Sequence, residues 1–220
     1  MVQHSKFGKV KRVREQFINR SSSKKLMFGI LLFLFVANTF GQTTSISREQ
    51  MKQDIDILFS TIEEVHPDMC AVYPKEQLDK DIEKVKSEFE PSGDKNYFFK
   101  HVTPLVVKLG DGHTSIHPPL SEPEDFANIL LFPLGVKITY PDKLIHVQND
   151  YTQTQNAVPI GAQITSINNR QAYDLVQEMM NYVSGEKDFF KIYVLEYYFT
   201  LLIHTLYDDS IFDIDYIVSG

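Results

Sequence analysis

The stretch "KLGDGHTSIHPP", residues 108–119, marks a change in hydrophobic periodicity that divides the chain into two unlike parts. Before it, apolar residues recur every three or four positions, which is the spacing of amphipathic helices. After it, they recur at every second position, which is the spacing of half-buried strands. Helices followed by strands are typical of an α+β fold. The apolar content of 43% can supply a hydrophobic core, so we expect a folded, globular protein.

Three helices are predicted before residue 110. The first begins after a capping box made by Ser47 and Gln50, and it ends before Pro67, which favours extended backbone in the residue that precedes it. The second opens with Pro74 at its first helical position. The third ends at Gly110, because glycine readily adopts the left-handed conformation that terminates helices.

Short strands and two further helices are predicted after residue 113. The expected strands are "TSIH", "LGVKITY", "KLIHVQN" and a segment through Ile164 and Ile167, with turns at Pro141, Gly161, Asn168 and Asn169. A helix is expected over 172–183, and a second one over 188–207 that is apolar on most faces and should therefore be buried. The alternating segment 211–218 reads as a strand with no partner after it in the sequence.

Residues 1–41 have the pattern of a secretory signal peptide with an extended basic region. Eight basic residues and one acid lead into an uncharged run of fifteen residues, 26–40, which is followed by the small residue Gly41. An uncleaved membrane anchor is the alternative, although a span needs about 20 apolar residues. We therefore expect export, to a bacterial periplasm or the exterior, with membrane contact only through this N-terminal segment. The oligomeric state is not indicated.

The remaining 179 residues are strongly acidic. They carry 28 acidic and 14 basic residues. Nucleic acids and anionic membrane surfaces repel such a chain, so neither is expected as a partner. Cys70 is the only cysteine, so an intrachain disulfide is excluded. No base lies near Cys70 in the sequence, and we therefore interpret it as an inert thiol.

Asp111 and His113 are the candidate catalytic pair. The glycines on both sides of Asp111 allow a sharp turn from which both side chains can project. An imidazole held in one tautomer by a neighbouring acceptor can take a proton from a hydroxyl nucleophile. A structural histidine that merely stabilises a tight turn is the alternative, and the residues alone leave both open.

A metal site built from Asp111, His113 and His117 is disfavoured. On a strand, residues 113 and 117 are about 13 Å apart at a rise of ~3.3 Å per residue, too far for adjacent ligands. Zinc ligands usually come as a helical pair four residues apart or as a short-spaced Cys/His cluster, and neither is present. We also find no Gly-x-Ser-x-Gly turn, phosphate loop or Cys-x-x-Cys motif, so the chain offers a candidate base without a candidate nucleophile.

Four segments together resemble the tail-specific, carboxy-terminal-processing serine peptidases and their tricorn-like relatives. They are "EEVHPD" at 63–68, "KLGDGHTSI" at 108–116, "FPLGVKI" at 132–138 and "PIGAQITSINNR" at 159–170. The resemblance implies a helical cap region at 44–117, a PDZ-like module at 128–184, and the first helix and strand of an α/β catalytic domain at 185–220, with the serine-bearing remainder missing. It also implies no cofactor and no metal.

The resemblance assigns roles to four residues. His113 resembles the general base of tricorn-like members, whereas other members use a lysine that follows the serine. Leu134, Gly135 and Val136 resemble the PDZ loop whose backbone N–H groups hold a peptide's terminal carboxylate. The implied function is the N-terminal portion of an exported serine peptidase that binds and cleaves polypeptides. The alternatives are a non-catalytic peptide-binding or scaffold protein, and a truncated reading frame without activity.

The signal-peptide interpretation predicts where the mature protein begins. When the chain is expressed in a bacterial host and the exported fraction is collected, N-terminal sequencing should start near Gln42. Soluble exported protein that retains Met1 would contradict the prediction.

Overall fold

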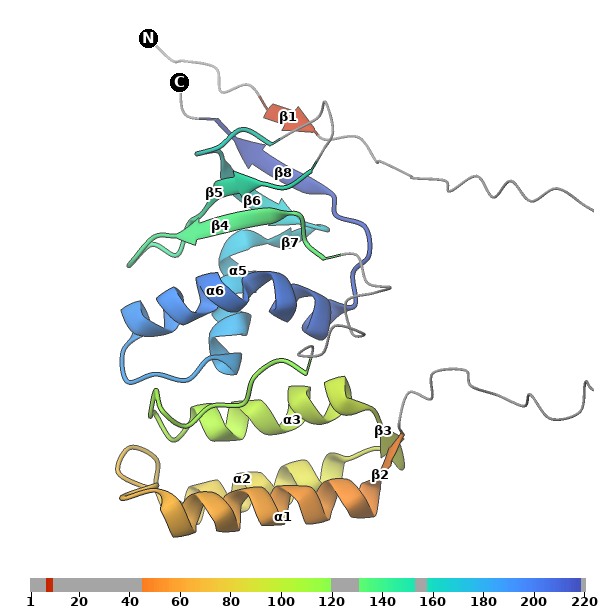
Figure 1. Cartoon of the computed structure of the whole chain (residues 1–220), viewed down its shortest axis with the longest axis vertical. Helices are drawn as coiled ribbons and strands as arrows, with labels where there is room; N and C mark the ends of the chain where they lie inside the picture. Colours follow the sequence, from red (N-terminus) through yellow and green to blue (C-terminus); the bar gives the residue numbers. More distant parts are fainter. Residues whose placement is uncertain (1–6, 10–44, 120–130, 153–157, 219–220) are drawn as a thin grey trace, which may run out of the picture.

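The computed structural model describes residues 7–9, 45–119, 131–152 and 158–218, and the fold is a mixture of helices and antiparallel sheets. Figure 1 shows the elements stacked along the long axis: a sheet at one end, then helices α5 and α6, then α3, and finally α1 and α2 at the other end. The α+β class is therefore confirmed at this level.

The three predicted N-terminal helices are present as α1 (Arg48–Val65), α2 (Lys75–Glu88) and α3 (Lys95–Val107). The Ser47–Gln50 capping box forms in both directions, and the Asp94 carboxylate accepts the Tyr97 N–H to cap α3. Strands β2 (Ile46–Ser47) and β3 (Ser92–Gly93) pair beside these helices. Their shared core contains Met51, Ile55, Phe59, Ile62, Met69, Leu78, Ile82, Phe89, Val102, Leu105, Val106 and Leu109.

The main sheet is antiparallel, in the order β1-β8-β6-β5-β4. Its strands are β1 (Phe7–Lys9), β4 (Leu134–Ile138), β5 (Ile145–Asp150), β6 (Gln163–Ile167) and β8 (Ile214–Ile217), with β7 (Arg170–Gln171) paired to β6. The predicted turns at Gly161, Asn168 and Asn169 all have positive φ, as the sequence indicated.

Helices α5 (Ala172–Met179) and α6 (Asp188–Tyr207) cover the sheet, with a short 3₁₀ turn (Met180–Tyr182) after α5. The core beneath them draws on β4, β5, β6, β8, α5 and α6, and it also includes Phe99 from α3. Ile116, in the segment that follows α3, is half-buried and packs against both this core and the helical one. The "LGDGHTSI" segment therefore passes along the junction of the two cores.

Helix α6 is tied to the edge strand β4 by one carboxylate. Glu196 Oε1 accepts the backbone N–H of Ile138 at 2.7 Å, and Oε2 accepts Lys137 Nζ at 2.8 Å. The Glu196 side chain is only 12% exposed but Lys137 is 59% exposed, so the ion pair is screened by solvent and the hydrogen bond to Ile138 is the better shielded contact.

Two sequence predictions need correction. The segment "TSIH" is not a strand, because residues 115–118 form no helix or strand and pair with no other backbone among the described residues. Helix α6 is buried on all sides only towards its end, at residues 202–206, because Phe189, Tyr193 and Tyr197 nearer its start are exposed. The terminal strand is present as β8, and it pairs with β6 and β1, both of which precede it in the sequence.

Two features bear on the predicted boundaries. The core that includes Phe132 also includes Ile214, so it runs across the expected division between residues 184 and 185. Strand β1 falls inside the expected signal segment, whose apolar run lies outside the described residues. Among the residues that the structure describes, no helix has the length and apolar character of a membrane span.

Two isoleucines on α1 give a matched test of the helical core. Ile55 is fully buried, whereas Ile57, on the same helix, is 63% exposed. We expect Ile55→Ala to lower the free energy of unfolding by about 2–5 kcal/mol, because it leaves a cavity. Ile57→Ala should change it by less than about 0.5 kcal/mol. Urea unfolding followed by circular dichroism measures both, and equal effects would show that α1 does not pack as described.

Candidate functional site

The candidate site lies in the turn after α3. Gly110 adopts φ +69°, and a side chain there would be strained and would lie 3.1 Å from Val72. A Cβ on Gly112 would come within 3.0 Å of the Phe190 ring. Glycine is therefore strongly favoured at position 110, and at position 112 a larger residue would need the Phe190 ring to shift slightly.

The Asp111 carboxylate is the centre of the site, and it accepts four hydrogen bonds. Oδ1 accepts the backbone N–H of His113 at 2.9 Å and its ring Nδ1 at 3.3 Å. Oδ2 accepts the Thr114 hydroxyl at 2.7 Å and His66 Nε2 at 3.0 Å. Three of the donors lie within three residues of Asp111, and the fourth comes from the end of α1, so this carboxylate fixes the turn to the helical layer.

These hydrogen bonds keep Asp111 ionised. The His113 backbone N–H, followed by the Thr114 hydroxyl, lowers the pKa of Asp111 most, and the imidazoles of His66 and His113 lower it further. Burial acts in the opposite direction but is outweighed. Asp111 can therefore act only as an acceptor at neutral pH.

His66 is locked in one tautomer. Its Nδ1 accepts the backbone N–H of Asp68 at 3.1 Å, so the proton must be on Nε2, which donates to Asp111. The His66 side chain is only 16% exposed. This histidine is therefore a fixed support for the carboxylate.

His113 is held differently, because its side chain is 95% exposed. Since Asp111 is ionised, the contact at 3.3 Å requires the proton on His113 Nδ1. The lone pair is then on Nε2, which has no hydrogen-bond partner among the described residues. The distance between Nδ1 and Oδ1 is at the long end for a hydrogen bond. His113 is thus held through Nδ1, while its other ring nitrogen is open to solvent.

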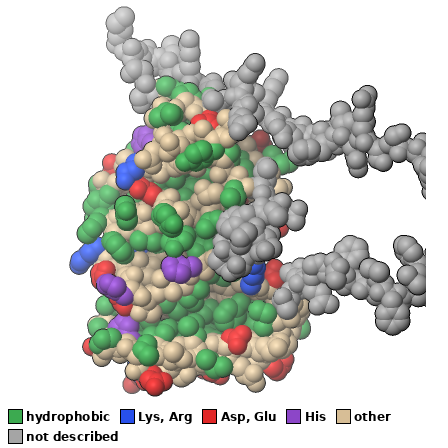
Figure 2. Space-filling view, viewed as in Figure 1, with side chains coloured by type: hydrophobic (Ala, Val, Ile, Leu, Met, Phe, Trp, Pro, Cys, Tyr) green, Lys and Arg blue, Asp and Glu red, His purple; other side chains and the backbone are tan. Residues whose placement is uncertain are grey.

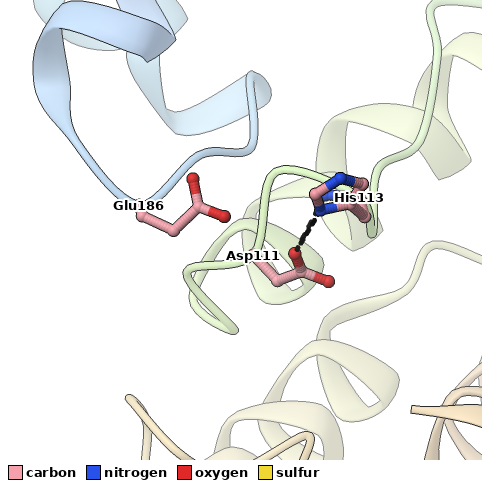
Figure 3. A group of neighbouring side chains, drawn as sticks. All are labelled: Asp111, His113 and Glu186. Carbon is pink, nitrogen blue, oxygen red and sulfur yellow. Dashed lines mark hydrogen bonds and ion pairs between the residues drawn. The ribbon is translucent and has the colours of Figure 1, made fainter. Parts of the chain in front are cut away.

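Glu186 completes a group of three polar side chains at this turn (Figure 3). It lies in the loop before α6, and its Oε1 accepts the Gly112 N–H at 3.2 Å. Hydrogen bonds from its own backbone N–H and from Gly112 lower the pKa of Glu186. Ligand atoms of Asp111, His113 and Glu186 lie within 4.8 Å of one another, so they could hold a metal ion. A metal on Asp111 would have to displace hydrogen bonds that already use both of its oxygens.

Two hollows flank the turn. An open one of about 490 Å³ is lined by His66, Pro67, Asp68, Ala71, Val72, Leu109, Gly110, Asp111, His113 and Glu186. A more enclosed pocket of about 220 Å³ is lined by Gly112, Ser115, Ile116, His117, Pro118, Tyr182, Val183, Ser184, Val194, Tyr198 and Leu202. Figure 2 shows histidine side chains gathered at one side of this face, near the level at which the helical layer meets the rest of the molecule.

His117 does not join the group around Asp111. Its Nδ1 pairs with the Tyr198 hydroxyl of α6 at 2.8 Å, and the two rings are 5.4 Å apart. The three residues considered from the sequence as metal ligands, Asp111, His113 and His117, therefore do not come together. In the structure the third residue beside Asp111 and His113 is Glu186.

Leu134, Gly135 and Val136 lie in strand β4, where their backbone forms a ladder with β5. The side chains of Leu134 and Val136 are buried in the sheet core. None of the residues that line the hollow at His113 comes from β4. The predicted carboxylate-binding segment is therefore part of a strand and contributes nothing to that hollow.

Two residues of the site were missed by sequence reasoning. His66 is not singled out by the sequence although it lies in the "EEVHPD" motif, and it is 45 positions from Asp111. Glu186 is 74 positions from Gly112, in a loop that carries no motif. A histidine next to a helix-ending proline was the one available signal.

The ionised carboxylate predicts a pH-dependent contribution to stability. Asp111→Asn should lower the free energy of unfolding at pH 7 by about 1–3 kcal/mol, the usual cost of losing hydrogen bonds to a charged acceptor. The folded-state pKa of Asp111 is depressed, so its contribution is complete above the unfolded value of about 3.9 and is lost as the pH falls below it. The difference in the free energy of unfolding between Asp111→Asn and the unmodified protein should therefore narrow from pH 5 to pH 3.

Urea unfolding across that pH range measures the difference, with the exposed Asp142→Asn as the control that should stay close to the unmodified chain. A difference that is constant from pH 7 to pH 3 would rule out the ionised carboxylate as its source.

Comparison with known family models finds no match to this chain, and comparison with curated proteins finds none either. The resemblance to the tail-specific peptidases therefore rests on the four sequence segments alone.

Proposed function

We propose that these 220 residues are the N-terminal portion of an exported serine peptidase in which His113 is the general base. The observation that carries this proposal is the contact of His113 Nδ1 with the Asp111 carboxylate, made while the rest of the imidazole is exposed. An imidazole with one nitrogen held by a carboxylate and the other open is the arrangement that activates a serine hydroxyl.

In the proposed reaction, His113 Nε2 takes the proton of a serine hydroxyl as the oxygen attacks the peptide carbonyl. The imidazolium that forms lies against Asp111, whose charge stabilises it. The low pKa of Asp111 means that the carboxylate keeps its charge and the proton stays on the ring. The proton is then returned to the leaving amine. The serine and the oxyanion donors come from a segment outside these residues.

His66 acts as a positioning residue in this proposal. Its single tautomer donates to Oδ2, which leaves Oδ1 directed at His113. Glu186 holds the Gly112 N–H from the other side. His66, at the end of α1, therefore supports the base through the Asp111 carboxylate, and Glu186 supports it through the backbone of the turn.

The proposed substrate is a polypeptide. The four sequence segments support this class, and the acidic composition of residues 42–220 disfavours a polyanion. The backbone of Leu134, Gly135 and Val136 remains the proposed contact for a peptide's terminal carboxylate. The N–H of Ile138, two residues beyond Val136, is already taken by the Glu196 carboxylate, so the proposed contact is confined to residues 134–136.

A non-catalytic peptide-binding protein is the second candidate. One observation favours it: within the described ranges, His113 is hydrogen-bonded to Asp111 alone, and no hydroxyl or thiol contacts its open nitrogen. The two candidates predict different results in the same experiment, because only the peptidase turns over substrate.

The test uses the natural gene product, with whatever sequence follows codon 220 in frame. A glycine-rich serine motif within about 200 further residues, the scale of one domain, is expected there. His113→Ala should lower kcat for an unstructured protein substrate by about 10²–10⁴-fold, the usual contribution of a general base. His146→Ala, on β5, should leave kcat unchanged.

Circular dichroism melting checks that both variants fold. Full activity in His113→Ala would transfer the role of base to another residue, such as a lysine after the serine. Absence of turnover in the unmodified protein would favour the binding function.

A further inference from the structure

The segment that follows His113 has no backbone hydrogen bond within the part of the chain that the structure describes. Residues 115–118 belong to no helix or strand, and no hydrogen bond involves the backbone of Ser115, Ile116 or His117 among those residues. Backbone N–H and C=O groups are obligatory hydrogen-bonding groups, so they need water, a ligand or a segment outside the described residues as partners. A backbone of this kind is a potential partner for another strand.

The side chains of this segment alternate in exposure. His113, Ser115 and His117 are exposed, whereas the intervening Ile116 is half-buried and Pro118 is buried. This period of two is the pattern of a strand that lies on a core with one face open. The exposed face begins at the proposed base, so a chain paired with residues 115–117 would run alongside it.

The enclosed pocket of about 220 Å³ opens beside the same residues. Segment 115–118 forms one wall, and the other walls come from the 3₁₀ turn after α5 and from α6. Its volume is below the ~300–1,000 Å³ of pockets for drug-sized ligands, which suits a single side chain. The walls are mostly apolar and aromatic, with Ile116, Val194 and Leu202 among them.

We propose that residues 115–117 pair with the backbone of an extended polypeptide, and that the 220 Å³ pocket takes one large apolar side chain of that polypeptide. This names a binding site and a side-chain preference for the substrate of the proposed peptidase. The inference rests on the proposed function only where it calls the bound polypeptide a substrate. The binding itself needs neither His113 nor a serine.

An extended peptide fits better than other occupants. Three consecutive residues without a backbone hydrogen bond in the described ranges match the repeating donors and acceptors of a peptide. A pocket without an unpaired charged group does not suit an anion or a cation. Ser184 lines the pocket, is only 5% exposed, and its Oγ has no hydrogen-bond partner among the described residues, so an incoming group could satisfy one further hydrogen bond.

The test measures binding of a blocked heptapeptide, acetyl-Ala-Ser-Ala-Phe-Ala-Ser-Ala-amide, to the 220-residue chain. Fluorescence anisotropy of a labelled copy gives Kd, and amide chemical shifts locate the site. The peptide with central Phe should bind at least tenfold more tightly than those with central Asp or Gly. The shifts should centre on residues 115–117 and on Val194.

Two further arms separate the pocket from the backbone pairing. Val194→Phe fills the pocket and should remove the preference for Phe, whereas Ile57→Phe, exposed on α1, should preserve it. Successive N–H groups of an extended strand point to opposite sides, so only one of two adjacent peptide N–H groups can face residues 115–117. N-methylation of that residue should weaken binding at least tenfold, whereas N-methylation of its neighbour should have little effect.

Each result decides the inference. Equal affinity for the three central residues, or shifts confined to β4, would overturn it, even if Val194→Phe failed to fold. Tighter binding of the free-acid peptide than of the amide, with shifts in β4, would assign peptide binding to the Leu134–Val136 backbone instead. If the peptide binds as expected but His113→Ala retains full turnover in the natural gene product, the inference stands and the base assignment falls.

Discussion

The burial of helix α6 on two sides is the constraint on which the rest of the fold depends. One side packs into the core of the main sheet, and its start and middle face the helical layer through α3 and the 115–118 segment. Because α6 is strongly apolar, it can be buried only if the sheet and the helical layer lie on either side of it. The turn that carries Asp111 and His113 is the connection between those two layers, so its position follows from the packing of this helix.

The Asp111 carboxylate converts that position into a defined local geometry. A turn with two glycines would sample many conformations by itself. Four donors on one carboxylate, two of them imidazoles from different parts of the chain, select one conformation. The two histidines then differ in role because of their surroundings: His66 is enclosed and bonded through both nitrogens, and His113 is bonded through Nδ1 and otherwise open to solvent.

Much of the fold could be predicted from local patterns. The capping box at Ser47, the positive φ at Gly110 and the turn at Asn168 and Asn169 were all predictable, because each depends on residues within a few positions of one another. The partners of β8 and the missing ladder at "TSIH" were not predictable in this way. Both depend on which distant backbone lies alongside, and alternation in a sequence indicates an exposed face without specifying a partner.

The same distinction applies to the site. Asp111 and His113 are two residues apart and share a turn, so the sequence could suggest their contact. His66 and Glu186 come from 45 and 74 positions away, and no spacing rule connects them to the turn. His117 lies four positions after His113, and its ring pairs with Tyr198 of α6 rather than joining the same cluster.

The contact between Glu196 and β4 also bears on the solubility of the protein. A strand at the edge of a sheet presents free N–H and C=O groups that can pair with another molecule and begin aggregation. At Ile138 the N–H is already taken by a carboxylate from α6, and the helix itself lies along that edge in Figure 1. The Glu196 side chain, which holds helix α6 to β4, therefore also keeps the Ile138 N–H from pairing with a strand of a neighbouring copy.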